Sequence, residues 1–205
     1  MSEFFQAFGT FLSECAAASL TMIFLENMLF SRALDTGTAL VIIRKKNNLL
    51  LFGSILTGIT VLSGIATYFL EPLIRRIVWA DYIRPLIYIA VIAVVYIIAL
   101  IVCGNFKEEQ KQKIMPMIHI SAFNFVVLGT LLLTAGKELT LASSLGYGLG
   151  AGIGFMLATF FISVAYDYLH SAAIPKAFRG FPVLLVYIGL LSLAFYGLIG
   201  HQLPY

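Results

Sequence analysis

The stretch "LENMLFSR" (residues 25–32) places a carboxylate, an amide, a hydroxyl and a guanidinium where a long apolar run would otherwise continue. If this run lies in a membrane, a charge at its centre costs about 2.5–3.5 kcal/mol on insertion scales. We therefore expect the helix to be interrupted near Asn27, with its polar side chains facing protein or a water-filled cavity. Broken membrane helices of this kind bring together side chains and freed backbone groups that bind ions. The alternative is purely structural, with the polar groups only satisfying an unwound helix.

The composition indicates that the run does lie in a membrane. Apolar residues make up 60% of the 205-residue chain and charged residues only 11%, and the mean hydropathy is +0.97. Soluble domains are about 25% charged, so this chain has too few charges to cover a globular surface. The net charge of +3 is too small to indicate a nucleic-acid partner. Cys15 and Cys103 are isolated from each other, so neither belongs to a local metal or redox motif.

Apolar segments recur along the whole chain and approach or reach the roughly 20 residues that a membrane-spanning helix needs. Six of them are present, at about 4–25, 48–70, 84–104, 114–134, 141–166 and 182–199. We expect an all-α membrane protein with six transmembrane helices in a single integral membrane domain, residues 1–205.

Positive charge alternates between the connecting loops. The loops after the first, third and fifth segments carry eight basic residues, which are Arg44, Lys45, Lys46, Lys107, Lys111, Lys113, Lys176 and Arg179. The loops after the second and fourth segments carry four, which are Arg75, Arg76, Arg84 and Lys137. Because cytoplasmic loops are enriched in Lys and Arg, we expect both termini to lie outside the cytoplasm.

The two halves of the chain carry matching features at equal spacing. Asn27 and Asn124 are 97 residues apart, and the prolines that open the third and sixth segments have the same separation. These matches predict two repeats, about 1–106 and 107–205, with interrupted first and fourth helices. Because each repeat has three spans, the second copy is inverted relative to the first. Such architectures place their working site near the middle of the membrane, on the broken helices.

The polar residues of the two interruptions form the candidate site. Glu26, Asn27 and Ser31 lie in the first interruption, and Asn124 lies in the second. We expect them to form a polar, ion-contacting site at mid-membrane. No Ser-His-Asp order, pair of catalytic carboxylates or His/Cys metal spacing emerges from the sequence, so we expect no catalytic residue and no metal ligand.

A glycine-rich run, "GYGLGAGIGF" (146–155), lies in the fifth segment. A dinucleotide-binding fingerprint would need a preceding strand, and nothing in this sequence indicates a strand. Gly146, Gly150 and Gly154 instead fall on one face of a helix, which favours the close approach of another helix.

Four stretches of the sequence resemble one family of membrane proteins. They are "IFLENMLFS" (23–31), "FNFVVLG" (123–129), "YGLGAGIGFMLA" (147–158) and "IPKAFRGFPVLLVYIGLLSLAFYGLIG" (174–200). They are similar to the six-span RnfA- and NqrE-type subunits of Rnf electron transport complexes and of the sodium-pumping NADH:quinone reductase. The resemblance implies a membrane subunit of an ion-translocating electron-transfer assembly in the bacterial cytoplasmic (inner) membrane.

The resemblance also implies partners and a cofactor. In that family, a homologous sister subunit of opposite orientation joins the first, beside flavoprotein subunits, and each of the pair supplies two cysteines to a shared [2Fe–2S] cluster. The matching positions in this sequence are Gly37 and Phe125. Neither side chain can ligate iron, which takes a thiolate, or an imidazole in Rieske-type sites. We therefore expect a divergent member without a cofactor of its own, paired with a sister chain or with itself.

Three functions remain open at this point. The first is a non-catalytic subunit of an Rnf- or Nqr-like translocase, which serves ion passage or the architecture of the complex. The second is a stand-alone transporter for a cation or small solute, motivated by the polar groups at mid-membrane. The third is a non-redox scaffold subunit, in which Phe125 fills the vacant cluster site with packing atoms.

Overall fold

The computed structural model describes residues 2–43, 49–169, 171 and 174–199, and this part of the chain contains helices but no strand. The elements are α1 (Ser2–Leu20), the π-helical turn η1 (Thr21–Leu25), α2 (Thr36–Ile43), α3 (Leu49–Ile74), α4 (Ala80–Gly104), α5 (Glu108–Ala122), α6 (Phe125–Thr134), α7 (Leu141–Leu169) and α8 (Phe181–Ile199). The predicted all-α class is confirmed. The basic residues Arg44, Lys45 and Lys46 lie outside the described residues.

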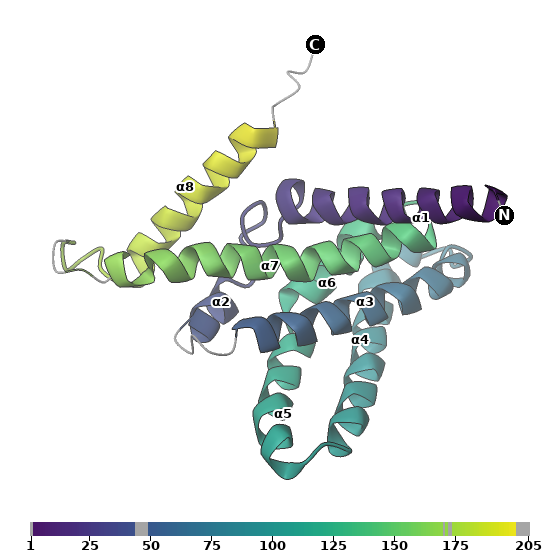
Figure 1. The fold of residues 1–205 in the computed structure, drawn as a ribbon, viewed down its shortest axis with the longest axis horizontal. Coiled ribbons are helices and arrows are strands. Elements are labelled where there is room, and N and C mark those ends of the chain that lie inside the picture. The colour runs from purple at the N-terminus through teal and green to yellow at the C-terminus, as the bar shows by residue number, and fades with distance from the viewer. Residues whose placement is uncertain (1, 44–48, 170, 172–173, 200–205) are drawn as a thin grey trace.

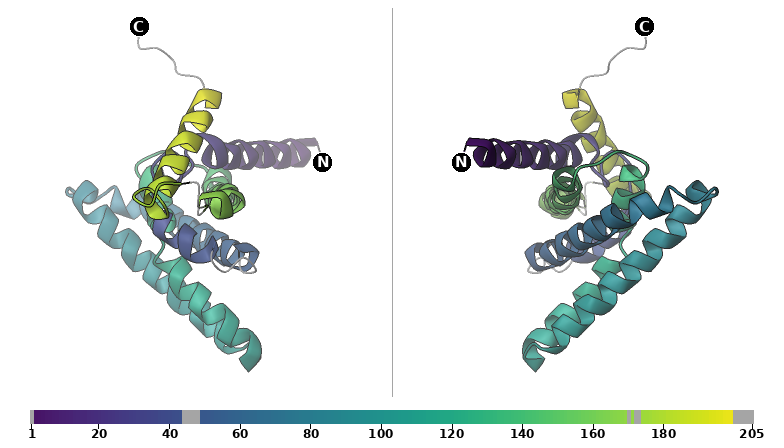
Figure 2. Two further views of the ribbon diagram at one scale, coloured as in Figure 1. Left: turned by 90° about the vertical axis from the view of Figure 1, so that its left-hand side faces the viewer. Right: turned by 90° about the vertical axis from the view of Figure 1, so that its right-hand side faces the viewer.

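α7 is the central helix of the fold, with α1 on one side of it and α3 on the other (Figure 1). Figure 2 shows α4 and α5 as a hairpin that leans away from these three helices, while α8 leaves from the end of α7. The largest fully buried side chains include Met22, Leu29, Phe52, Val126 and Phe155. The apolar core therefore joins both halves of the chain around α7.

The glycines of α7 explain how two helices pack so closely against it. A Cβ atom added at Gly146 or Gly150 would collide with backbone atoms of α1. A Cβ atom added at Gly148 or Gly152 would collide with atoms of α3. The predicted packing face is thus confirmed, and a second glycine face, opposite to the first, serves α3. Small residues allow membrane helices to gain van der Waals contact where hydrophobic burial cannot drive association.

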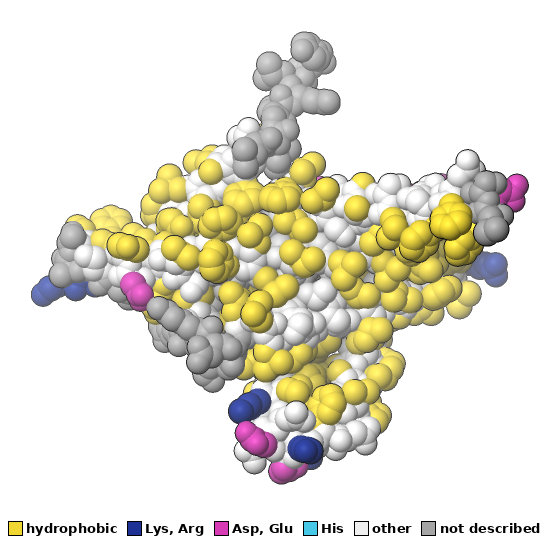
Figure 3. Space-filling model, viewed as in Figure 1, with side chains coloured by type: hydrophobic (Ala, Val, Ile, Leu, Met, Phe, Trp, Pro, Cys, Tyr) yellow, Lys and Arg dark blue, Asp and Glu magenta, His cyan; other side chains and the backbone are white. Residues whose placement is uncertain are grey.

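The helices have the lengths and the surface of membrane spans. Four of those described are long and apolar enough, namely Glu3–Leu25, α3, α4 and α7. α5 and α6 together make a fifth candidate, bent by 42°, and the apolar stretch of α8, Phe181–Gly197, is shorter. Apolar side chains cover the face seen in Figure 3, and the charged side chains lie at its edges. The structure thus shows four or five candidate spans, and a sixth span at α8 stays a prediction.

Candidate functional site

The first interruption is built around the side chain of Asn27, which is fully buried. Asn27 Oδ1 accepts hydrogen bonds from the backbone N–H groups of Leu29 (3.0 Å) and Phe30 (3.1 Å). Its Nδ2 donates to the carbonyl oxygens of Ile23 (2.9 Å) and Gly154 (3.0 Å). The amide therefore satisfies the backbone of the broken helix and ties that helix to α7. All of its hydrogen-bonding capacity goes into holding the turn, because an amide side chain offers two donors and one acceptor oxygen.

Glu26 and Ser31 lie on the outer side of the same turn. Glu26 Oε2 accepts a hydrogen bond from Arg32 Nη2 at 2.9 Å, and these side chains are 35% and 45% exposed. Ser31 Oγ donates to the carbonyl oxygen of Leu25 at 2.9 Å. The turn thus brings Glu26 and Arg32 into contact, although residues six positions apart do not face each other on one straight helix. Both predicted site residues form hydrogen bonds within the turn, and their contact with an ion stays a prediction.

The turn ends at Asp35, whose charge the sequence places beside those of Glu26 and Arg32 but outside the candidate site. Asp35 has a φ of 63° and Ala33 a φ of 53°, both in the left-handed region that residues with side chains seldom adopt. Thr38 Oγ1 donates a hydrogen bond to Asp35 Oδ1. Asp35 Oδ2 is buried and has no hydrogen-bond partner among the described residues. Strained backbone at a buried carboxylate is a common sign of a functional position.

The second interruption lies between α5 and α6. Asn124 caps α6, because its Oδ1 accepts a hydrogen bond from the backbone N–H of Val126 at 2.7 Å. This is the usual role of Asn before the first helical turn. Its Nδ2 is buried and, within the described part of the chain, has no acceptor. Unlike Asn27, Asn124 therefore retains an unused donor.

The two interruptions meet at these two side chains. The side-chain amide of Asn124 and the backbone N–H of Phe125 lie near enough to the Asp35 carboxylate to interact with it. Neither donor completes a hydrogen bond to Asp35 Oδ2 in the structure as described. The N-terminus of α6 adds a partial positive charge, which favours a carboxylate there. The open atoms are a carboxylate oxygen and an amide N–H donor, and a bridging water could join them.

The two positions that correspond to cluster ligands lie at the surface of this chain. No described atom lies within 4 Å of a Cβ added at Gly37, and Phe125 is 61% exposed. In this chain the ring of Phe125 points outward from the start of α6, so its filling of a vacant cluster site between two subunits stays a prediction. Cys15 adjoins α7 at Gly146, about 12 Å along that helix from the contact of Asn27 with Gly154.

These residues do not fit a [2Fe–2S] cluster held by this chain. The ligand positions offer a hydrogen atom and a phenyl ring, whereas the cluster requires thiolate or imidazole. Among the described residues, no three His, Cys, Asp or Glu side chains gather in a way that could hold a metal ion.

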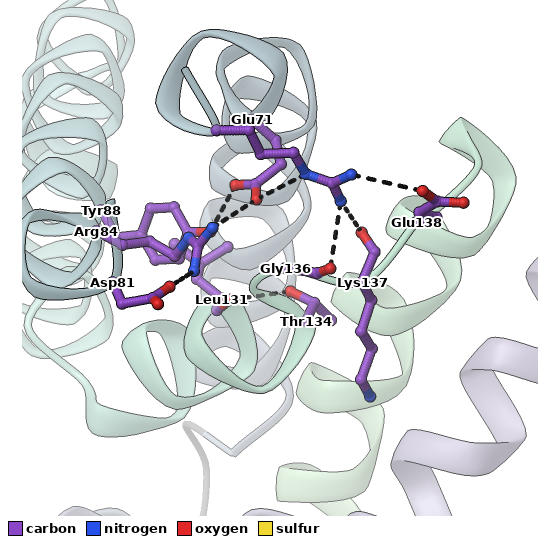
Figure 4. Close-up of polar contacts among 10 residues, drawn as sticks. Glu71, Asp81, Arg84, Tyr88, Leu131, Thr134, Gly136, Lys137 and Glu138 are labelled. Carbon is purple, nitrogen blue, oxygen red and sulfur yellow. Dashed lines mark hydrogen bonds and ion pairs between the residues drawn. The ribbon is translucent and has the colours of Figure 1, made fainter. Parts of the chain in front are cut away.

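A second polar cluster lies where α3 ends and α4 begins, and the sequence analysis missed it (Figure 4). Glu71 accepts hydrogen bonds from Arg84 Nη2 (3.1 Å), Tyr88 Oη (3.1 Å) and Arg75 Nε (3.4 Å). The side chains of Glu71 and Arg84 are only 15% and 12% exposed. A carboxylate four residues before an arginine at the end of an apolar helix is the signal that could have revealed it.

Arg75 also ties this cluster to the second half of the chain. Its Nη2 donates to the carbonyl oxygens of Lys137 (2.8 Å) and Gly136 (3.3 Å), in the loop between α6 and α7. The loops after the second and fourth segments therefore lie at the same end of the molecule, as the charge alternation requires. Which side of the membrane this end faces stays a prediction.

The sequence is similar to those of known membrane proteins. A family model described as "Rnf-Nqr subunit, membrane protein" matches residues 16–201. The A-type subunit of the Na(+)-translocating ferredoxin:NAD(+) oxidoreductase complex of Acetobacterium woodii is 26% identical over 184 residues, covering 90% of this chain and 96% of that protein. The A-type subunit of the ion-translocating oxidoreductase complex of Pasteurella multocida is 31% identical over 138 residues, covering 67% and 72%. Its namesake from Vibrio cholerae is 29% identical over 152 residues, covering 70% and 75%.

Proposed function

The chain belongs to the Rnf-Nqr family of membrane subunits, and from that membership we propose that it serves as an A-type membrane subunit of a bacterial ion-translocating oxidoreductase complex. Relatives with that name align over most of both chains. The observation that carries the role in ion passage is the contact of the two helix interruptions, because Gly129 of α6 lies against Met28 and Leu34 of the first turn. Discontinuous helices that meet inside a membrane protein are the usual place for ion contact.

The residues of the interruptions divide into two groups under this proposal. Glu26, Asn27 and Ser31 maintain the turn, because each is engaged in hydrogen bonds within it. Asp35 contacts the ion through its buried Oδ2, whereas the buried Nδ2 of Asn124 is an N–H donor that is free to bind a water beside the carboxylate. A carboxylate oxygen is a suitable ligand for a hard cation.

The proposal includes an inverted pair of repeats and a partner chain. Each half contains an interrupted helix, then a long helix with small residues, then an apolar helix, in the same order. Gly37 and Phe125 lie exposed near the point where the halves meet, so a homologous sister subunit could cover both. This chain brings no iron ligand of its own to that contact, and electron transfer would depend on cofactors of other subunits.

Membership of a complex is tested by purification from the native membrane. The tagged chain, solubilised in a mild detergent, should bring down a homologous membrane protein together with flavin- or iron-bearing subunits, detected by mass spectrometry and flavin fluorescence. A second tagged inner-membrane protein of similar size provides the control. Recovery of this chain solely as a stable homodimer would reject the proposal.

Ion contact is tested in inside-out membrane vesicles that hold the assembled complex. Asp35→Asn should lower redox-driven cation uptake at least tenfold, because it removes the buried negative charge while preserving size. Asp81→Asn is the matched control, since the side chain of Asp81 is 88% exposed, and should leave uptake unchanged. Unaltered uptake in the Asp35 variant would remove this carboxylate from the mechanism.

The alternative function is a stand-alone transporter for a cation or small solute, and the same buried polar atoms favour it. Proteoliposomes that contain only this chain separate the two roles. Uptake without any redox partner, abolished by Asp35→Asn, would establish the transporter. Absence of uptake by the chain alone, together with uptake by the complex, would establish the role within a complex. If the complex pumps equally well with Asp35→Asn and with Asp81→Asn, the chain serves as a scaffold subunit.

A further inference from the structure

A cavity opens beside the polar cluster at the end of α3. It has a volume of about 490 Å³ and is lined by residues of α3, α4, α6, α7 and the connections that follow α3 and α6, among them Thr67, Glu71, Arg75, Thr134, Glu138 and Ser144. Its mouth carries two carboxylates and two cationic side chains, since Lys137 lines it as well. The cavity therefore has a polar entrance without an excess of either charge.

A polar stripe on α3 leads from this cavity into the core. Thr60, Ser63, Thr67 and Glu71 follow one another at intervals of three or four residues and so share one helix face. Thr60 and Ser63 are fully buried, and Thr67 and Glu71 line the cavity. The stripe extends about 16 Å along the helix axis. Its inner end is thus far from any polar surface.

A second, shorter polar stripe on α6, formed by Thr130 and Thr134, reaches the same cavity. Thr134 lines the cavity, Thr130 is buried one turn earlier, and Asn124 caps the other end of the helix. The distance from Thr134 to Asn124 is about 15 Å along the axis. α3 packs against α6, so the two stripes converge at the cavity and lead toward the interruptions.

The hydrogen bonding of these residues leaves room for water. Ser63 Oγ, Ser121 Oγ and Asn124 Nδ2 are all buried and find no partner among the described residues. Buried polar groups of this kind are usually satisfied by ordered water. Thr67 and Thr130 donate to carbonyl oxygens of their own helices, which leaves the oxygen of each hydroxyl free to accept a hydrogen bond from water or to bind a cation.

We propose that the cavity is the mouth of a hydrated passage between α3 and α6, through which a monovalent cation reaches Asp35 and Asn124. This inference rests on the proposed ion-conducting function and adds the route. Neutral hydroxyls replace part of the water shell of the cation along the stripes. Because the mouth is electrically balanced, selection for a cation falls to the carboxylate of Asp35 at the inner end.

Substituted cysteines test the passage without any transport measurement. Ser63→Cys and Thr67→Cys are made separately in a chain with Cys15→Ala and Cys103→Ala, placed in lipid nanodiscs, and treated with a cationic, membrane-impermeant methanethiosulfonate. A thiol reacts as its thiolate, which forms only where water or polar groups stabilise the charge. Thr159→Cys is the matched control, because Thr159 is equally buried and its hydroxyl also lacks a described partner, about 22 Å along α7 from Ser144.

Both cysteines on the α3 stripe should react at least tenfold faster than the control. If the cysteine at position 63 reacts as slowly as the control while the one at 67 reacts fast, the cavity is closed at its inner end and the proposal is overturned. Slow reaction at both positions overturns it as well. Should Ser63→Cys fail to fold, Thr60→Cys takes its place. The labelling uses the full chain by itself and is therefore independent of the purification test. If the cysteines react fast but the chain co-purifies with no redox partner, the proposed passage stands and the proposed membership of a complex is rejected.

Discussion

Replacement of Asn27 by alanine should weaken the fold more than any other single change in the two interruptions. The substitution removes four hydrogen bonds from a fully buried side chain. A hydrogen bond contributes about 1 kcal/mol net in soluble proteins and about 0.6 kcal/mol between membrane helices. Four bonds therefore correspond to a loss of about 2–4 kcal/mol in the free energy of unfolding. The N–H groups of Leu29 and Phe30 would be left without an acceptor in the turn.

Asn124→Ala is the matched control for this prediction. Asn124 is the same residue type, is buried, and lies in the other interruption, but in the described structure its amide makes a single hydrogen bond, to Val126. Loss of that cap should cost about 1 kcal/mol. Unfolding in mixed micelles with increasing sodium dodecyl sulfate, followed by far-UV circular dichroism, measures both variants. If Asn27→Ala costs no more than Asn124→Ala, Asn27 does not build the turn as described.

Three further changes separate packing, charge and exposure. Gly150→Ala should lower the free energy of unfolding by about 1–3 kcal/mol through overpacking against α1. Its control, Gly58→Ala, has no described atom nearby and should be neutral or stabilise the fold by up to about 1 kcal/mol. Equal shifts of the thermal unfolding midpoint in the two variants would contradict close packing at Gly150. Arg84→Ala should lower the free energy of unfolding in detergent by about 2–3 kcal/mol, because it leaves the largely buried carboxylate of Glu71 without its partner. The control Asp81→Asn should lower it by less than about 1 kcal/mol. Phe125→Ala should change the unfolding free energy by less than about 0.5 kcal/mol, and a loss above about 2 kcal/mol would show that the ring is buried.

The positions of the interruptions could be predicted from the sequence because the signal there is local. A buried amide in an apolar segment is costly unless its hydrogen bonds are satisfied, so Asn27 and Asn124 predict that the backbone departs from a regular helix. The same reasoning could not tell the two asparagines apart. The amide of Asn27 completes its hydrogen bonds only because the carbonyl oxygen of Gly154 on α7 lies 3.0 Å from its Nδ2. That contact depends on how α1 crosses α7.

Residues brought together over long sequence distances escaped the sequence analysis. Asp35 follows the first interruption and Asn124 lies in the other half, so no periodicity connects them. Glu26 pairs with Arg32 in the turn, a contact over six residues that only the break in the helix permits. Glu71 and Arg84 lie on different helices, and only the tight connection between α3 and α4 brings their charges within 3.1 Å.

The class of the protein, the order of its apolar helices, the places where two of them break and the glycine face of α7 can all be read from the sequence. These properties follow from transfer free energies and steric limits that act on each segment separately. Which polar atoms are satisfied, and which remain open at Asp35 and Asn124, depends on how the helices pack. Hydrogen bonds need partners within about 3 Å, and the crossing of helices from both halves of the chain sets those distances.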